Sequence, residues 1–317
     1  MILITGSAGY IGSHISCYFE QKKIKYLGID NLKYSYRSNV PSKKKFFQID
    51  ISNLKNVEKL INKYKIKTII HTAAFSYVLE GEHKKHKYYT NNIIKTKKFI
   101  EICKKCKIEN FIFLSSSNVY KEKKLNNSYV EINNTIPKNF YGKNKIMIEK
   151  FLKNKFKKLI IFRLFNVVGI FNDKFKMYKF NKKNYQRLLF KIIQNISNGK
   201  TTEINYIKDR KKIKKIFPSR DFIEIIDVVK IIEKSINKVS LMNKFYKIIN
   251  VGTGIDISID KIVDEIKASK VKKLKIKYKE ISNKEFSFTK SNIKKLIRFT
   301  GIKPKLNLKR VIKSHLN

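Results

Sequence analysis

The first half of the chain alternates short apolar runs with longer stretches in which apolar residues recur at helical spacing. Ile11, Ile15 and Phe19 illustrate this spacing, because they fall on one face of a helix that follows the first run. Apolar strands joined by helices are typical of a parallel sheet with right-handed crossovers. The pattern therefore predicts an α/β fold with a doubly wound, Rossmann-like parallel sheet. Its expected strands are Ile2–Thr5, Lys25–Ile29, Lys45–Ile49, Thr68–His71, Phe111–Ser115 and Leu159–Leu164.

The pattern is less regular after residue 168, where we expect the first domain to end. Residues 171–183 are basic and aromatic, and residues 208–215 form a charged run without apolar spacing, which predicts an exposed loop. Further expected elements are strands at Phe222–Ile226 and Phe245–Val251 and a helix from Ser258 to Ile266. We predict a first domain over residues 1–168 and a smaller α/β substrate-binding domain over residues 169–317, with segments that return to the first. The substrate cleft is expected between the two domains.

Charge is the most unusual property of the composition, because 72 basic residues against 24 acidic ones give a net charge of +48. Such a charge favours nucleic acid or another anionic partner. However, seven of the 72 basic residues are arginine, the residue best suited to reading phosphates and bases, and lysines occur in every segment. We therefore favour a solvated basic surface over a specific nucleic-acid site. The charge should still attract anionic substrates at low salt.

Three further features bear on location and metal binding. The chain has no run of eighteen apolar residues, which argues against a membrane span, and the first strand leaves no room for a signal peptide. Three cysteines cannot build a disulfide framework, so we expect a cytoplasmic protein. Cys103 and Cys106 have no second pair in the sequence, and we expect no metal site.

A glycine loop follows the first predicted strand and opens the first predicted helix. Gly6, Gly9 and Gly12 let the backbone approach a pyrophosphate, whose charge would face the helix N-terminus. Alone, this loop could be a tight structural turn. Asp30 ends the second strand, where an acidic group bonds the ribose hydroxyls of a dinucleotide and repels a 2′-phosphate. The first domain is therefore predicted to bind NAD rather than NADP.

Tyr141 and Lys145 are spaced by one helical turn, so their side chains project from the same helix face. A phenol with a pKa of about 10 is a poor base at neutral pH, but a nearby ammonium and an oxidised nicotinamide both favour the phenolate. A shift of about three pKa units corresponds to about 4 kcal/mol. The alternative is an ordinary surface helix of a lysine-rich chain. The position between the fifth and sixth strands favours hydride chemistry coupled to proton transfer on an alcohol carbon.

Serines end the fifth predicted strand, at the carboxyl edge where doubly wound sheets bind ligands. Ser115, Ser116, Ser117 and Asn118 occupy this place. A hydroxyl there can bond both the phenol and the reacting oxygen of the substrate. A serine-rich turn without chemistry is the alternative.

Many matching stretches extend this interpretation over nearly the whole chain. They are Thr5–His14, Gly28–Leu32, Asp50–Ile51, Ile70–Ala74, Tyr88–Asn92, Asn110–Tyr120, Tyr141–Lys145, Arg163–Gly169, Arg220–Asp227, Asn250–Gly254 and Gly301–Pro304. In these stretches the chain resembles the extended short-chain dehydrogenase/reductase family, and within it the NAD-dependent nucleotide-sugar epimerases that act on UDP-glucose. The resemblance implies NAD as the cofactor, a UDP-hexose as the substrate and a homodimer as the assembly.

The resemblance also implies a role for individual residues. Those expected to bind the cofactor are Gly6, Gly9, Tyr10, Ile11, Gly12, Asp30, Asn31, Asp50, Ile51, Ala73, Ala74, Asn91, Tyr141, Lys145 and Phe165. The expected catalytic set is Ser116, Tyr141 and Lys145, and the expected substrate-binding residues are Ser116, Tyr141, Asn166 and Arg220.

This chain departs from the family pattern at several positions. Ser76 stands where these epimerases carry a lysine, Leu164 where they carry a tyrosine, and residues 282–285 lack the arginine that clamps the nucleotide. The charged run 208–215 replaces a glycine-rich loop. These changes leave the cofactor and proton chemistry intact but bear on the choice of nucleotide-sugar.

The resulting hypothesis is the interconversion of UDP-glucose and UDP-galactose through a transient 4-keto sugar, with Tyr141 as the base. Two alternatives stay open. One is a related epimerase that acts on N-acetylated or uronic nucleotide-sugars, and the other is an NAD-binding scaffold with a basic surface and no turnover. A dehydratase is disfavoured, because Ser117 and Asn118 stand where dehydratases of the family carry an acidic pair.

Overall fold

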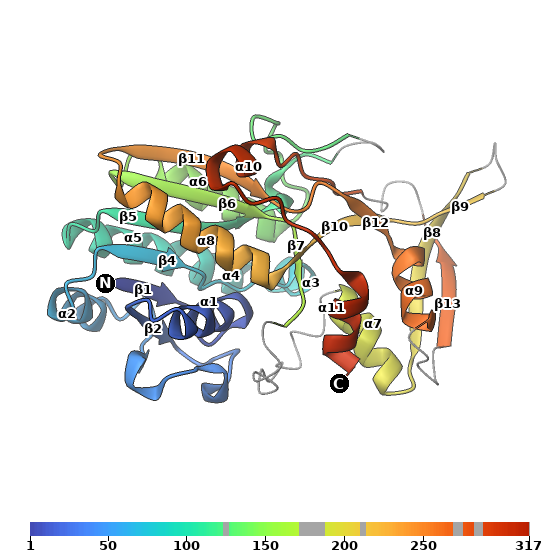
Figure 1. The fold of residues 1–317 in the computed structure, drawn as a ribbon, viewed down its shortest axis with the longest axis horizontal. Helices are drawn as coiled ribbons and strands as arrows, with labels where there is room; N and C mark the ends of the chain where they lie inside the picture. Colours follow the sequence, from blue (N-terminus) through green and yellow to red (C-terminus); the bar gives the residue numbers. More distant parts are fainter. Residues whose placement is uncertain (123–126, 171–187, 210–213, 269–274, 282–287, 317) are drawn as a thin grey trace.

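The computed structural model describes residues 1–122, 127–170, 188–209, 214–268, 275–281 and 288–316. Among these residues, seven parallel strands form the main sheet, in the order β11-β6-β5-β4-β1-β2-β3 (Figure 1). They are β1 (Ile2–Thr5), β2 (Tyr26–Asp30), β3 (Phe46–Gln48), β4 (Thr68–His71), β5 (Asn110–Ser116), β6 (Lys158–Leu164) and β11 (Phe245–Val251). The predicted strands before residue 165 are confirmed, and β11 joins the main sheet by pairing with β6. The doubly wound α/β fold is confirmed with them.

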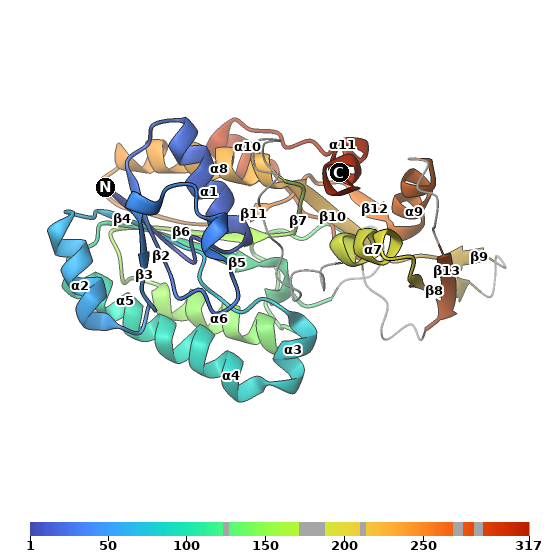
Figure 2. The same ribbon diagram turned by 90° about the horizontal axis from the view of Figure 1, so that it is seen from below.

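Helices cover both faces of the main sheet, which Figure 2 shows from its edge. One face carries α1 (Tyr10–Gln21), α8 (Ile225–Ser240) and α10 (Lys294–Thr300), and the other carries α2 (Leu54–Lys63), α5 (Thr96–Lys105) and α6 (Phe140–Leu152). Ile15 and Phe19 of α1 pack with Ile231 of α8 in the first core. Phe99 of α5 and Ile148 of α6 belong to the second core. Because the five inner strands are buried on both faces, they read as nearly continuous apolar runs.

A second lobe lies beside the main sheet, on the right of Figure 1. One of its small sheets has the order β12-β10-β7, and another has the order β13-β8-β9. Their strands are β7 (Asn166–Val168), β8 (Thr201–Asp209), β9 (Lys214–Ile216), β10 (Ser219–Glu224), β12 (Asp256–Ser258) and β13 (Lys275–Glu280). The helices of this lobe are α7 (Leu188–Ser197), α9 (Ile259–Ala268) and α11 (Leu308–Leu316). Ile192, Ile204, Ile262 and Ile312 belong to the core that joins these helices to the sheets.

Two predictions for the second half are wrong in part. The strand expected at Phe222–Ile226 ends at Glu224, and α8 begins at Ile225, because one short apolar run spans a strand and the first turn of a helix. The loop expected at residues 208–215 is instead strand at both ends, since β8 runs to Asp209 and β9 starts at Lys214. Exposed strands tolerate such lysines. Residues 171–183 and 282–285, which the sequence analysis singled out, lie outside the described residues.

A long helical segment carries polar residues to the edge of the pocket described below. It runs without a break through α4 (Lys85–Tyr89), the π-helical η3 (Thr90–Lys95) and α5. Asn92 in η3 accepts a hydrogen bond from the backbone N–H of Phe75 at 2.8 Å and donates one to its carbonyl oxygen at 2.9 Å. The π-helical turn thereby fixes the loop after β4, and such turns are frequent at functional sites.

Short helical segments complete the described chain. They are η1 (Arg37–Asn39), η2 (Lys43–Lys45), α3 (Val78–His83) and η4 (Ser117–Val119). Within the described ranges, no helix has the length and apolar character that a membrane span requires.

Candidate active site

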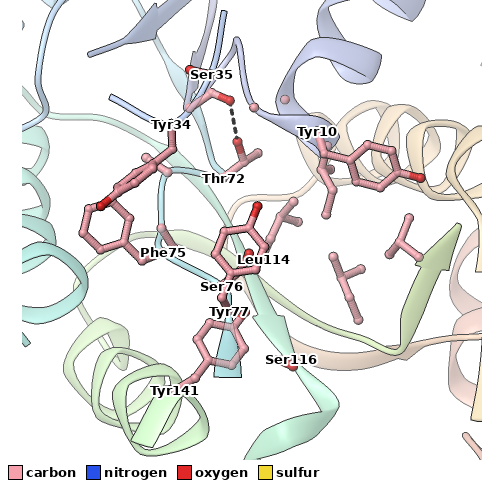
Figure 3. A pocket seen from close by; sticks show the side chains of 18 of the residues that line it. Tyr10, Tyr34, Ser35, Thr72, Phe75, Ser76, Tyr77, Leu114, Ser116 and Tyr141 are labelled. Carbon is pink, nitrogen blue, oxygen red and sulfur yellow. Dashed lines mark hydrogen bonds between the residues drawn. The ribbon is translucent and has the colours of Figure 1, made fainter. Parts of the chain in front are cut away.

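A pocket of about 410 Å³ lies at the carboxyl ends of the main-sheet strands, where β1, β2, β4, β5 and β6 end (Figure 3). Doubly wound sheets bind their ligands at this edge. The pocket is lined by every residue that the sequence analysis assigned to the cofactor, the proton transfer or the substrate, apart from Arg220. The structure thus brings these residues together, while their individual roles stay predictions.

The glycine loop between β1 and α1 has no room for side chains. A Cβ atom on Gly12 would lie 2.2 Å from the carbonyl oxygen of Gly6, and Gly6 itself has a φ of +67°. Larger residues would therefore push α1 away from the loop. Helix α1 begins at Tyr10, so its N-terminus, which favours anions, points at the pocket.

Asp30 stands at the end of β2 and lines the pocket next to the glycine loop. Its carboxylate accepts hydrogen bonds from the backbone N–H groups of Leu32 at 2.8 Å and Ala8 at 3.1 Å, and from the Ser35 hydroxyl at 2.9 Å. Burial raises the pKa of Asp30, and these hydrogen bonds oppose the rise. The position is the one that a dinucleotide ribose requires.

A second carboxylate anchors the neighbouring wall of the pocket. Asp50 accepts hydrogen bonds from the Asn31 amide at 2.7 Å, the Lys95 ammonium at 2.8 Å and the Ser52 hydroxyl at 2.6 Å. Burial would raise the pKa of Asp50, but the hydrogen bonds from Lys95, Ser52 and Asn31 outweigh it and hold the pKa well below its usual value. Asp50 is therefore ionised at physiological pH and keeps Asn31 oriented.

Helix α6 presents Tyr141 to the pocket from its first turn, as Figure 3 shows. The helix starts at this point because the side chain of Asn139 accepts a hydrogen bond from the backbone N–H of Gly142 at 2.8 Å. A Cβ atom on Gly142 would lie 2.2 Å from the carbonyl oxygen of Asn118. The glycine inside the Tyr-x-x-x-Lys motif therefore allows α6 to pack directly on the segment that follows β5.

Lys145 is buried beneath Tyr141. Its Nζ atom donates a hydrogen bond to the carbonyl oxygen of Leu114 at 2.7 Å and lies 5.7 Å from the centroid of the Tyr141 ring. Burial lowers the pKa of Lys145 to about 7, and the negative charge of Glu149 opposes this shift. The ammonium form, which favours a phenolate at Tyr141, therefore exchanges with the neutral amine near neutral pH.

Ser116 ends β5 on the other side of Tyr141 and is 7% exposed. Its hydroxyl oxygen accepts hydrogen bonds from the backbone N–H of Asn118 at 3.2 Å and from its side-chain amide at 3.0 Å. Because both bonds use lone pairs of the oxygen, the hydroxyl hydrogen can be donated toward the pocket.

The expected substrate residues lie at the junction with the second lobe. Asn166 lines the pocket and donates a hydrogen bond to the carbonyl oxygen of Asp221 at 3.0 Å. Arg220 does not line the pocket, but it shares one face of β10 with Phe222, which does. Burial lowers the pKa of Arg220, and the charge of Glu122 opposes the shift. Arg220 thus lies two residues before Phe222 on β10, next to the pocket wall.

An aromatic part of the pocket wall was not predicted from the sequence. Tyr34 and Phe75 meet edge to face with ring centroids 4.7 Å apart, and Tyr77 also lines the pocket (Figure 3). Tyr34 comes from the loop after β2 and Phe75 from the loop after β4, so the two loops are in contact at this part of the wall. Their place just after strand ends at the binding edge was the available signal.

The geometry of the pocket by itself indicates a class of enzyme. A glycine cradle that excludes side chains and a half-buried acid after β2 fit a dinucleotide, and a phenol beside a buried ammonium fits proton transfer coupled to hydride transfer. The chain belongs to the NAD dependent epimerase/dehydratase family, whose family model matches residues 2–252. It is accordingly an NAD-dependent enzyme of the epimerase type.

Three known proteins with similar sequence or structure are nucleotide-sugar epimerases. The UDP-glucose 4-epimerase of Haemophilus influenzae is 28% identical over 302 residues, which cover 89% of this chain and 86% of that protein. The UDP-Glc/GlcNAc 4-epimerase of Campylobacter jejuni is 28% identical with a TM-score of 0.83, covering 99% of this chain and 97% of the other. A UDP-glucose 4-epimerase of Brucella ovis in complex with NAD has a TM-score of 0.89 at 22% identity, with coverage of 99% and 97%, and shows the shared fold.

Proposed function

We propose that the protein interconverts UDP-glucose and UDP-galactose by inverting the configuration at C4 of the sugar. One observation carries the proposal. Tyr141 and Lys145, one helical turn apart on α6, face the same pocket as Ser116 and the glycine loop. The similarity to a UDP-glucose 4-epimerase over most of both chains supports the choice of substrate.

Tyr141 acts as the base and then as the acid. NAD, when bound, supplies an acceptor and then a donor of hydride, so that C4 passes through the keto level. Tyr141 takes the proton of the 4-hydroxyl onto its phenolate oxygen and later returns it to the same sugar oxygen, so the complete cycle has no net oxidation. Ser116 donates its hydroxyl hydrogen to that sugar oxygen. Lys145 in its ammonium form stabilises the phenolate.

The diphosphate and the sugar must be held differently. Asn166 and Arg220 hold the UDP diphosphate, a task that suits a guanidinium fork. The sugar has to turn over between the two half-reactions, so its own contacts must be weak. Apolar residues such as Phe190 and Phe222 line this part of the pocket and fit such loose contact.

A second candidate is an epimerase for N-acetylated nucleotide-sugars. The similarity to the UDP-Glc/GlcNAc 4-epimerase of Campylobacter jejuni favours it. All the catalytic residues are shared between the two candidates, so the size of the sugar pocket decides between them. A uronic nucleotide-sugar is the third substrate to test on the same grounds.

The experiment is incubation of the purified protein with UDP-galactose, UDP-N-acetylgalactosamine and UDP-glucuronate, followed by analysis of the product sugars. Conversion of UDP-galactose to UDP-glucose is expected. Conversion of another of these sugars in its place would move the assignment to that substrate. No conversion of any of them, with NAD bound, would contradict an epimerase for these substrates.

Tyr141→Phe tests the role of the phenol. We expect it to lower kcat by about three orders of magnitude or more while NAD binding stays nearly normal, because the lost group moves the proton and the ring is kept. Tyr77→Phe removes another phenol from the same pocket wall and should change kcat by a few-fold at most. Full activity of Tyr141→Phe would refute the proposed role.

A further inference from the structure

Glu149 is a buried acidic residue that the proposed mechanism does not use. It lies one helical turn after Lys145 and two turns after Tyr141, so the three residues share a face of α6. Its side chain is 3% exposed. A carboxylate is rarely buried to this extent without a partner or a task.

The Glu149 carboxylate connects three elements of the fold. Arg163 of β6 donates to it from Nε at 3.1 Å and from Nη2 at 2.7 Å, and the Ser115 hydroxyl of β5 donates to it at 2.5 Å. The Arg163 side chain is also 3% exposed. Replacing such a buried ion pair by apolar side chains is often neutral or stabilising, so the pair calls for an explanation other than stability.

These bonds fall where the proposed catalytic residues come together. Ser115 directly precedes Ser116, and Leu114, whose carbonyl oxygen accepts from Lys145, directly precedes Ser115. Helix α6 is therefore bonded to two consecutive residues of β5, first by Lys145 and then by Glu149. This pair of bonds fixes the position of Tyr141 on α6 relative to Ser116 on β5.

We propose that Glu149 is a positioning residue of the active site, which holds α6 against the end of β5 and supplies the buried negative charge that faces Lys145. This inference rests on the proposed function, because it acts through the residues that move the proton. Glu149 itself does not touch the pocket. Its effect is on the place of Tyr141 and on the charge of Lys145.

The charges that face Lys145 can be named from each neighbouring element. Glu149 and Tyr141 come from α6, His71 comes from β4, and Arg163 of β6 is bonded to Glu149. Burial lowers the pKa of His71 to about 3, so His71 stays neutral across the working range. Of these groups, Glu149 is the one whose charge favours the ammonium form of Lys145. Its removal should lower the pKa of Lys145 by about one to two units, for unit charges roughly 6 Å apart at an effective dielectric constant of about 20.

Glu149→Gln tests the inference through the pH dependence of the holoenzyme. The amide removes the charge, so the alkaline limb of kcat/KM should move down by about one to two pH units. The hydrogen bonds from Ser115 and Arg163 lose their charge assistance, and this weaker tether should lower kcat by about ten- to a hundredfold with KM within a few-fold. Glu149→Asp keeps the charge and should return the alkaline limb to within about half a unit of wild type.

Glu224→Gln is the matched control. Glu224 is also a buried glutamate paired with an arginine, Arg310, but its partners belong to other elements. This variant should lose stability without moving the alkaline limb. If Glu149→Gln does not fold, the double variant Glu149→Leu/Arg163→Met replaces the buried pair by apolar side chains. It is expected to show a smaller downward shift, because the positive charge of Arg163 is lost together with the negative charge of Glu149.

A second readout does not require turnover. The free energy of unfolding in urea is measured against pH for each protein and for its Lys145→Met counterpart. The pH at which the difference between the two starts to change reports the folded-state pKa of Lys145. Removal of the Glu149 charge should lower this pH by the same one to two units. An unchanged onset, or an unchanged alkaline limb with wild-type kcat, would overturn the inference. If wild type has no epimerase activity but Glu149→Gln still lowers the onset pH, the proposed function is rejected and the link between Glu149 and Lys145 stands.

Discussion

Lys145→Met should make the protein more stable while abolishing its chemistry. The substitution replaces a buried ammonium by an apolar side chain of similar length. The pKa of Lys145 falls from 10.5 to about 7 in the folded state, because burial disfavours the charged form. This difference corresponds to about 5 kcal/mol, as an order of magnitude. Below pH 7 both states carry the proton, so wild type bears the whole destabilisation.

The sign of the pH dependence follows from proton binding. Between pH 7 and pH 10.5 the unfolded state holds the proton and the folded state does not, so the free energy of unfolding of wild type rises with pH. Lys145→Met lacks this contribution. Between pH 6 and pH 9, wild type should therefore gain about 3 kcal/mol relative to the variant. The variant's advantage in stability is largest at low pH and fades as the pH rises.

Urea unfolding of the NAD-free proteins, followed by circular dichroism at several pH values, measures this difference. Lys143→Met is the control, because Lys143 is an exposed lysine on the same helix and its loss should leave the pH slope of wild type unchanged. Parallel stability curves for wild type and Lys145→Met between pH 6 and pH 9 would refute the reasoning. They would show that Lys145 titrates alike in the folded and unfolded states.

Two further substitutions test the pocket walls. Asp30→Ala should weaken NAD binding by about ten- to a hundredfold, because a charged acceptor of the pocket wall is lost, and should raise the affinity for NADP relative to NAD. Calorimetric titration checks both, and unchanged selectivity would contradict the prediction. Gly142→Ala places a Cβ 2.2 Å from the Asn118 carbonyl oxygen, so it should destabilise the fold by about 1–3 kcal/mol in urea and lower kcat; unaltered stability would contradict the close packing.

Local spacing explains why much of the site could be predicted from the sequence. Gly6 and Gly12 lie within one loop, Asp30 ends the next strand, and Tyr141 and Lys145 lie one helical turn apart. Each of these features depends on a short segment and on its place relative to a strand. The parallel sheet then brings the segments together, because the carboxyl ends of its strands share an edge.

The parts that were missed depend on contacts between distant segments. Tyr34 and Phe75 come from two different loops and are in contact in the pocket wall, and no local sequence pattern predicts that contact. Arg220 was expected to bind the substrate diphosphate, and this role stays a prediction; the short sheet that contains β10 sets Arg220 beside the pocket wall. Glu149 had a local signal, since it follows Lys145 by one helical turn. Its meaning, however, comes from Ser115 and Arg163 on two separate strands.

In a chain with 72 basic residues, residue type alone cannot identify a functional lysine. Burial can. Lys145 is the lysine that is buried among the described residues, whereas Lys95, which bridges to Asp50, keeps 29% of its side chain exposed. A buried ammonium destabilises the fold by several kcal/mol, and a nearby carboxylate such as Glu149 offsets part of this cost. Folding stability alone would favour an apolar side chain at residue 145. The proposed function accounts for a lysine at this position, because it requires a positive charge beside the phenol of Tyr141.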